Sequence, residues 1–313
     1  MAVEMMAEQD GAVFLPVVVG SVQWETSMSG SPGRLTFTVL EEEGFPALRE
    51  GCRVSLRLDG TLLFCGYVFT RVQEGRRLVS VTAYDQLRYL LSRDTLLYVG
   101  MTASGLLRMI AADYRLALGE VEETGYVIAQ GAEENAALRD MLENALDETA
   151  RATGRRYVLF DDGGRLCLRH VDSLRTNVLL DESCALSFTC RESIDTGAYS
   201  RVKLLYEDGR RGIRRVFTAS DESLAGRWGV LQYFEKLQDP AGAQEKAGRL
   251  LRAYGTPLME VTVKGAAGSP QVRAGSQVTL DLPRAAGLFL VESACHIFFG
   301  SAHTMDLTMT EGG

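Results

Sequence analysis

The residues able to do chemistry are few. The chain has only three histidines among 313 residues. His170 lies near Asp172, Cys167 and Ser173, which is the residue set of a nucleophile served by a histidine and a carboxylate. Residues this close on one strand rarely converge on a single point, so we expect His170 to be an ordinary residue at the end of a strand.

Soft metal ligands occur near the C-terminus, where Cys295, His296 and His303 would suit zinc. Cys184 and Cys190 are separated by five residues. These spacings match no common zinc ribbon or finger. We therefore expect all six cysteines to be reduced and mostly buried, and we expect no metal and no cofactor.

Paired carboxylates occur at Asp161 and Asp162, but Gly163 and Gly164 follow them, which favours a turn over an acid/base pair. The acidic run at residues 41–43 is interpreted as a solvated loop. The sequence has no phosphate-binding glycine loop, no zinc-protease helix motif and no hydrolase nucleophile elbow. These features predict a protein that is not an enzyme.

The densest aromatic stretch, residues 228–234, has two interpretations. It is either a strand that fills a core or an anchor for a partner, since Trp and Tyr dominate the binding energy of interfaces. The candidate interface residues are Trp228, Tyr233 and Phe234.

The elements that would position these residues start with a β-rich segment. Apolar and polar residues alternate in strand-like runs, and Asp59-Gly60 is the favoured pair for a two-residue hairpin. The expected strands are 17–19, 22–25, 35–39, 54–58, 62–72 and 78–84. Six such strands predict a small antiparallel barrel over residues 1–95, because closure hides sheet edges. Asp85 is an expected N-cap of a short helix that closes one end.

Helical periodicity replaces alternation after residue 102. Apolar residues recur at helical spacing over 103–114 and 138–149, with Asn135 as an expected cap and Gly154 as the expected C-terminal stop. A hairpin pattern over 157–170 follows. Residues 96–195 therefore predict an α+β insert.

The β pattern returns after residue 197. Strands are expected at 199–206, 213–217, 259–263, 277–282, 288–299 and 303–310. A helix is expected near 240–254, starting at Asp239-Pro240. Residues 196–313 thus predict a second barrel interrupted by a helix, and the whole chain reads as an α+β protein that is mainly β.

Composition agrees with a folded protein of two or three domains. The chain is 46% hydrophobic and 24% charged, with a net charge of −8, which excludes a disordered chain. No apolar run approaches the roughly 20 residues of a membrane helix. No basic leader precedes the first apolar run, so we expect the chain to stay in the cytoplasm unless a larger assembly carries it out. The insert is acidic, and no basic stripe predicts nucleic-acid binding.

The sequence also resembles a known family. The similarity lies in VTAYDQLRYL at 81–90, in 102–104 and 124–128, in RWGVLQYFEKL at 227–237, and in the C-terminal segments 272–276, 290–292 and 303–308. These segments resemble, in order, the XkdQ/YqbQ proteins of phage-like element PBSX and related contractile-tail phages.

That resemblance implies a baseplate hub of a contractile injection system, in a phage tail, a prophage tail or a tail-like bacteriocin. Two tube-like barrels plus insertions would form a homotrimer that adapts a hexameric tail tube to a trimeric central spike. Expected partners are the tube protein, the spike protein, other baseplate proteins and the tape measure. The protein would reside in the particle's baseplate after assembly in the bacterial cytoplasm.

Two other function classes remain open. A tail-associated peptidoglycan hydrolase would need a positioned pair of carboxylates, a Cys-His couple or a metal, and none is visible in the sequence. A receptor-binding or carbohydrate-binding module would need exposed aromatic platforms, whereas most aromatic residues here are in phase with strand cores.

Overall fold

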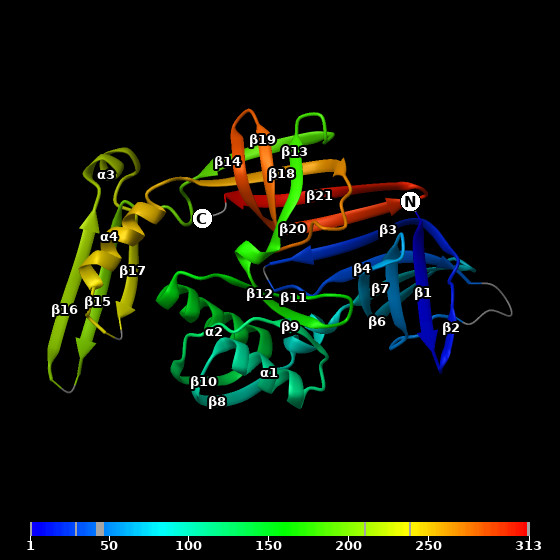
Figure 1. Cartoon of the computed structure of the whole chain (residues 1–313), viewed down its shortest axis with the longest axis horizontal. Helices are drawn as coiled ribbons and strands as arrows, with labels where there is room; N and C mark the ends of the chain where they lie inside the picture. Colours follow the sequence, from blue (N-terminus) through cyan, green and yellow to red (C-terminus); the bar gives the residue numbers. More distant parts are fainter. Residues whose placement is uncertain (1, 29, 42–46, 210, 238, 312–313) are drawn as a thin grey trace. The chain divides into compact units, whose positions relative to one another are not determined.

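The computed structural model describes residues 2–28, 30–41, 47–209, 211–237 and 239–311. The chain is mainly β, with 54% strand and 19% helix, and Figure 1 follows it from the N-terminus to the C-terminus. It divides into two compact units. Unit 1 holds Met1–Phe188 and Thr262–Met309, and unit 2 holds Thr189–Val261 with the last four residues.

The first half of the large sheet comes from the N-terminal segment. Its strands are β1 (Val3–Gln9), β2 (Ala12–Phe14), β3 (Val18–Ser27), β4 (Arg34–Leu40), β5 (Arg53–Leu58), β6 (Thr61–Glu74) and β7 (Leu78–Tyr84). They lie in the order β3-β4-β7-β6-β5-β1-β2. Alternate residues such as Leu35, Phe37 and Val81 are buried in one core. The Asp59-Gly60 hairpin is confirmed, with φ of 46° and 81° at its two turn residues.

The second half of this sheet is built from two separate stretches of chain. Its strands are β13 (Arg175–Asp181), β14 (Ser187–Ser193), β18 (Leu258–Ala267), β19 (Gln277–Leu282), β20 (Ala285–Phe299) and β21 (Ala302–Glu311). The order is β14-β18-β21-β20, with β19 pairing β20 and β13.

The two halves repeat one strand order. In the first half β3-β4-β7-β6-β5 are neighbours, and in the second half β14-β18-β21-β20-β19 are neighbours. Each half contains three consecutive strands whose middle member is long: β6 has 14 residues and β20 has 15. The sixth strands differ, because β1 runs antiparallel to β5 whereas β13 runs parallel to β19. Five strands therefore repeat within the chain.

A seam between β3 and β20 joins the halves into one sheet. Six residue pairs are in antiparallel register, from Ser293 opposite Ser27 to Phe298 opposite Val22. The rings of Trp24 and His296 stack across it with centroids 4.9 Å apart. Strands from the two ends of the sequence thus lie side by side (Figure 1).

An α+β part lies between the halves in sequence. Its elements are the 3-10 helices η1 (Gln86–Leu91) and η2 (Val171–Leu174), strands β8 (Arg93–Met101), β9 (Leu118–Val121), β10 (Ile128–Ala137), β11 (Tyr157–Asp161) and β12 (Leu166–His170), and helices α1 (Ala103–Asp113) and α2 (Leu138–Thr153). Both predicted α-helices are confirmed, as are the cap at Asp85 and the stop at Gly154. The predicted Asn135 cap is wrong, because Asn135 lies within β10 and the N-cap of α2 is Ala137.

Unit 2 contains a separate three-stranded sheet. Strands β15 (Arg201–Asp208), β16 (Ile213–Ser220) and β17 (Gln232–Leu237) lie in the order β16-β15-β17, with helices α3 (Glu222–Trp228) and α4 (Ala243–Tyr254). Helix α4 packs on one face of this sheet, where Val202, Leu204 and Ala247 are buried. The helix predicted near 240–254 is confirmed, but it starts after Gly242 rather than at Asp239.

Three expectations about architecture need correction. Over the described ranges no sheet closes into a barrel. The helix near 240–254 does not interrupt a barrel, because it covers the small sheet of unit 2. Residues 175–193, which the expected insert included without any predicted strand, form β13 and β14 of the large sheet. Sequence alternation shows that a strand has a buried face but does not identify its neighbours.

Of the helices described, none is long and apolar enough to cross a membrane.

Candidate functional site: a polar face across two joined half-sheets

One face of the large sheet carries short hydroxyl side chains. Thr36 and Thr38 on β4 lie opposite Thr82 and Ser80 on β7, and Thr38 and Ser80 are 3.4 Å apart between hydroxyl oxygens. The same face continues across the seam. We call the set the polar face: Thr36, Thr38, Thr70, Ser80, Thr82, Ser27, Ser293, Thr304, Thr308 and Thr262. The opposite face of these strands is buried in the core.

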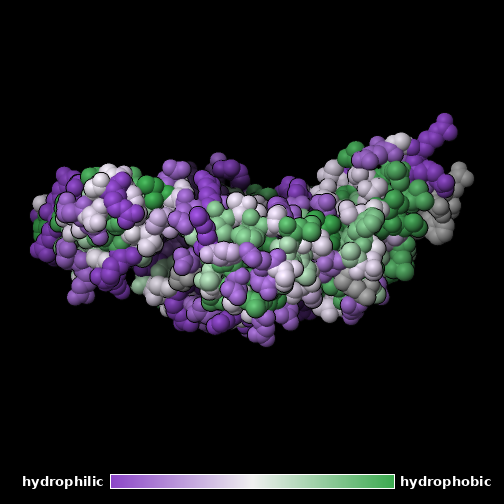
Figure 2. Space-filling model, turned by 90° about the horizontal axis from the view of Figure 1, so that it is seen from above, coloured by the Kyte–Doolittle hydropathy of each residue, from purple (hydrophilic) through white to green (hydrophobic). Residues whose placement is uncertain are grey.

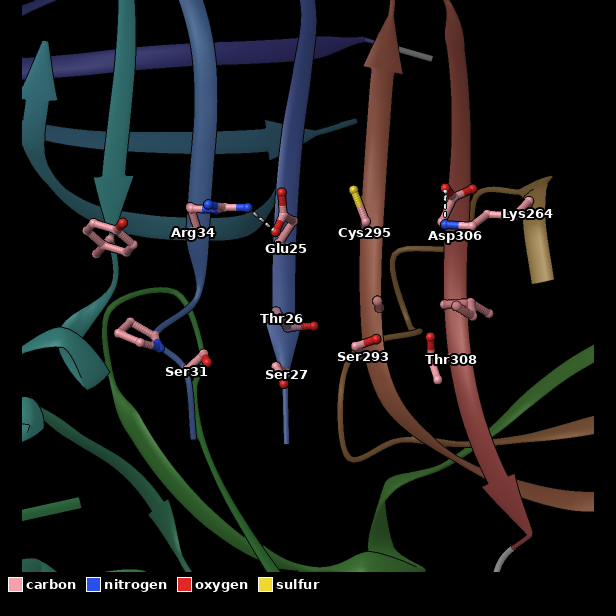
Figure 3. Close-up of a pocket in the computed structure, with 14 residues that line it drawn as sticks. Glu25, Thr26, Ser27, Ser31, Arg34, Lys264, Ser293, Cys295, Asp306 and Thr308 are labelled. Atoms are coloured by element: carbon pink, nitrogen blue, oxygen red, sulfur yellow. Dashed lines mark hydrogen bonds and ion pairs between the residues drawn. The ribbon is translucent and has the colours of Figure 1, made fainter. Parts of the chain in front are cut away.

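Two ion pairs lie on the polar face. Arg34 and Glu25 form an ion pair of 2.6 Å, and Lys264 and Asp306 form one of 3.0 Å. They lie on either side of the seam and line a pocket of about 480 Å³ (Figure 3). Each cation is matched by one carboxylate, so this part of the surface carries no net charge.

Cys295 lies in the pocket between the two ion pairs (Figure 3). Burial, followed by the negative charge of Glu25, raises the pKa of its thiol from 9.0 to about 11. Because only the thiolate attacks electrophiles, Cys295 is a poor nucleophile at neutral pH.

This thiol gives a direct prediction. At pH 8, the thiolate fraction of Cys295 is expected to be about 100-fold below that of an ordinary thiol, because the pKa is raised by about two. Alkylation with iodoacetamide, followed at Cys295 by peptide mass spectrometry, should slow to a similar degree. The same chain in urea is the control. Equal rates in folded and unfolded protein would disprove the assignment.

A second site is a mostly buried cluster of charged side chains, Asp85, Asp161, Asp162 and Arg273, which we call the junction. Arg273 donates to the backbone oxygen of Asp161 at 2.6 Å, and its guanidinium lies 4.2 Å from the centre of the Phe160 ring. Asp162 lies 3.6 Å from the same guanidinium. Asp85 and Asp161 are each only 4% exposed. Burial raises the pKa of both carboxyl groups, while Arg273 opposes that rise.

The junction ties three stretches of the chain together. Asp85 caps η1 at Leu87 and also accepts from the amide of Gly33 on the approach to β4. The side chain of Gln86 donates to the backbone oxygen of Ala117 at 3.3 Å and accepts from its amide at 2.8 Å. The junction therefore links the first half, the α+β part and the loop before β19.

The histidines near the C-terminus also meet. His296 Nδ1 lies 2.8 Å from His303 Nε2, and His296 Nε2 lies 2.8 Å from the backbone oxygen of Val272. A carbonyl only accepts, so His296 carries its proton on Nε2 and accepts from His303. Burial lowers the pKa of His296 to about 4. Cys295, one residue earlier on the strand, points to the opposite face, so the three do not form a ligand set.

The other residues singled out in the sequence form no catalytic set. His170 Nδ1 lies 3.6 Å from an Asp172 carboxylate oxygen, but the hydrogen bonds of Ser173 and Cys167 go to other groups. The Ser173 hydroxyl donates to Glu122 and to the carbonyl of His170, while the thiol of Cys167 contacts the carbonyl of Arg165. Asp161 accepts from the amide of Gly164, as the turn interpretation requires. In the acidic run at 41–43, Glu41 pairs with Arg71, and residues 42 and 43 lie outside the described ranges. Cys52, Cys65 and Cys167 are buried, and all six cysteines are unpaired.

The three candidate interface residues are in unit 2 but do not share one surface. Trp228 ends α3 and is half-buried. Tyr233 packs against Tyr199 and Tyr254 under α4, with ring centroids 5.5 Å and 5.4 Å away. Phe234, its neighbour on β17, points to the other face and is 53% exposed. Tyr233 is thus a core residue of unit 2, and Phe234 is the exposed aromatic side chain.

A second surface feature is apolar. Figure 2 shows hydrophobic side chains gathered at the right-hand end, where β1 and β2 lie in Figure 1. Val13, Leu15, Val17 and Phe299 are each more than half exposed. A cavity of about 600 Å³ adjoins them. Apolar patches of this kind mark surfaces that partners cover.

Comparisons with known proteins cover nearly the whole chain. A family model described as YQBQ-like matches residues 22–310. The phage-like element PBSX protein XkdQ of Bacillus subtilis (strain 168) is 29% identical over 309 residues, which cover 95% of this chain and 94% of that protein.

Two solved structures are similar in fold. The 43 kDa tail protein of prophage MuSo2 from Shewanella oneidensis has a TM-score of 0.70 at 12% identity, with 98% of each chain covered. A tail protein from Neisseria meningitidis MC58 has a TM-score of 0.72 at 14% identity, covering 100% of this chain and 98% of that one. Both likenesses concern the fold.

Proposed function

The chain belongs to the YQBQ-like family, and from this premise we propose that it is a structural protein of a phage-tail baseplate. In this proposal three copies form a hub between a hexameric tail tube and a trimeric central spike in a contractile injection system. The observation that carries the proposal is the strand order repeated within one chain.

The repeat supports a change of symmetry. A closed homo-oligomer displays each surface once per subunit, so three identical subunits normally offer three equivalent sites. A subunit with two similar halves offers two similar sites. Three copies of the chain then present six similar half-sheets toward the tube. Surfaces that occur once per chain appear three times and match the three-fold symmetry of the spike. Each half would be one tube-like unit, and closure of the sheet would come from assembly rather than from the single chain.

The polar face suits the lining of a channel. A surface that lets DNA or a polypeptide pass must not retain it, and several unpaired cations would bind phosphates strongly. Here the ion pairs Arg34–Glu25 and Lys264–Asp306 cancel their charges, and the remaining side chains are mostly short hydroxyls. We therefore assign the polar face to the lumen.

The remaining surfaces are assigned to partners. The apolar end around β1 and β2 would contact another tail component. The segment 96–195 carries 17 acidic and 10 basic residues. Its α+β part, residues 96–174, would lie at the periphery, because like charges near a symmetry axis repel, whereas its strands β13 and β14 belong to the large sheet. Trp228 and Phe234 are proposed as contacts of unit 2 with neighbouring baseplate proteins.

No observation favours the hydrolase alternative. Within the described ranges, the carboxylates and histidines that the sequence suggested for catalysis are engaged in turns, ion pairs, the junction or the stacked histidine pair. The raised pKa of Cys295 also weakens a thiol mechanism.

Native mass measurement tests the proposal. We expect light scattering to give three times the chain mass of 34.3 kDa, and we expect the trimer to bind separately purified tube and spike proteins. Incubation with purified cell walls should release no soluble fragments. A monomer that persists with both partners present would disprove the hub, and wall digestion would favour the hydrolase.

A further inference from the structure

The seam within the chain shows which strand edges of the two half-sheets associate. At the seam, β3 runs antiparallel beside the second part of β20, over residues 293–298. Ring stacking between Trp24 and His296 and a hydrogen bond from the amide of Met28 to the oxygen of Glu292, at 2.8 Å, reinforce it. Two half-sheets of this chain therefore associate through these two edges.

The repeat assigns an equivalent to each edge. β20 corresponds to β6, since each is the long middle strand of three consecutive strands. β3 corresponds to β14, because each is the end strand of its five-strand order. β3 lies beside β4 in the first half, and β14 lies beside β18 in the second half. The edges equivalent to the two sides of the seam are thus β6 and β14.

Both equivalent edges lack a strand neighbour among the described residues. β5 accompanies β6 only as far as Val68, which bonds to Gly51 and Cys52. Beyond that point β6 pairs with β7 alone, through Thr70, Val72 and Glu74. Among the described residues, β14 is the last strand of the sheet on its side and pairs only with β18. Edges with unpaired backbone groups readily accept another strand.

We propose that β14 of one copy pairs antiparallel with the outer half of β6 in a second copy, repeating the β3–β20 seam. The proposal rests on the hub assigned above and names the contact that builds it. Each copy contributes one β6 edge and one β14 edge, so the contact is head-to-tail and closes into a ring when the rotation allows. The sheet then has no interruption along β14-β18-β21-β20-β3-β4-β7-β6, and the polar face becomes continuous from copy to copy.

Disulfide trapping tests this contact. In a chain with Cys184→Ser and Cys190→Ser, Val72→Cys is combined in turn with a cysteine at each of residues 187, 188, 189 and 191. Strands that pair bring Cα atoms within the roughly 4.4–6.8 Å that a disulfide needs. Mild oxidation should give covalent dimers and trimers, and no larger species. Positions on one side of β14 should react and those on the other side should not.

The control moves the first cysteine to another edge. Val13→Cys on β2 is also exposed, and combined with the same β14 cysteines it should give no covalent trimers. A trimeric mass without any cross-link from Val72→Cys would overturn the β6–β14 contact and leave the hub standing. Cross-linking through Val13→Cys would place the contact at β2. A monomer in the presence of the tube and spike proteins would overturn both proposals.

Discussion

Arg273→Met is expected to lower the free energy of unfolding by about 3–5 kcal/mol, the cost of leaving buried charges without their partner. The Arg273 side chain is 15% exposed and lies between Asp162, the Asp161 backbone oxygen and the Phe160 ring. Removing it leaves Asp85 and Asp161 buried without the cation that lowers their pKa values. Urea unfolding followed by circular dichroism measures the loss.

A control variant and the dependence on pH distinguish this electrostatic loss from a general loss of stability. Arg284→Met removes an exposed arginine next to β20 and should change stability by no more than about 0.5 kcal/mol. Because the pKa values of Asp85 and Asp161 are raised in the folded state, their ionisation opposes folding as pH rises. The loss in free energy of unfolding caused by Arg273→Met should therefore be larger at pH 7 than at pH 4. A loss that is equal at both pH values would contradict the electrostatic explanation.

Acid is expected to weaken the protein through His296. Its pKa falls from 6.5 to about 4 in the folded state, so the unfolded chain binds this proton first. The contribution of neutral His296 to the free energy of unfolding is therefore fully present above pH 6.5 and is lost as the pH falls through 4. The difference of about 2.5 between the pKa values of the unfolded and folded states corresponds to about 3 kcal/mol in the free energy of unfolding. His303, whose pKa is also lowered by burial, acts in the same direction.

His296→Phe isolates this effect. Phenylalanine retains a ring against Trp24 and Phe298 but cannot take up a proton. It also loses the hydrogen bonds to Val272 and His303, so its stability at pH 7 is lower. The informative quantity is the slope with pH. Between pH 7 and pH 3.5 the natural chain should lose about 3 kcal/mol more than the variant. Parallel curves would show that His296 does not titrate in this range.

Local features of the fold could be predicted from the sequence. The Asp59-Gly60 turn, the Asp85 cap and the Gly154 stop were predictable because each depends on residues within a few positions of one another. Helices α1 and α2 were predictable from the spacing of their apolar residues. Helix α3 was missed, since only seven residues form it and the aromatic run 228–234 obscured its end.

Features that depend on distant pairing could not be predicted. Strands β13 and β14 join strands that follow them by many residues, and alternation carries no information about such partners. The junction joins Asp85, Asp161 and Arg273 from three separate stretches. The sequence pattern around Asp161 indicated only a turn. A buried arginine near two carboxylates gives no local signal, so only the fold could reveal it.

The seam also sets the timing of folding during synthesis. Trp24 and His296 pair across it, although a ribosome adding about 5–20 residues per second needs tens of seconds to travel from one to the other. Throughout that interval the edge of β3 that faces away from β4 has no strand partner. A chain that stops early never joins its two halves. Only a chain synthesised beyond residue 298 can therefore join its two half-sheets.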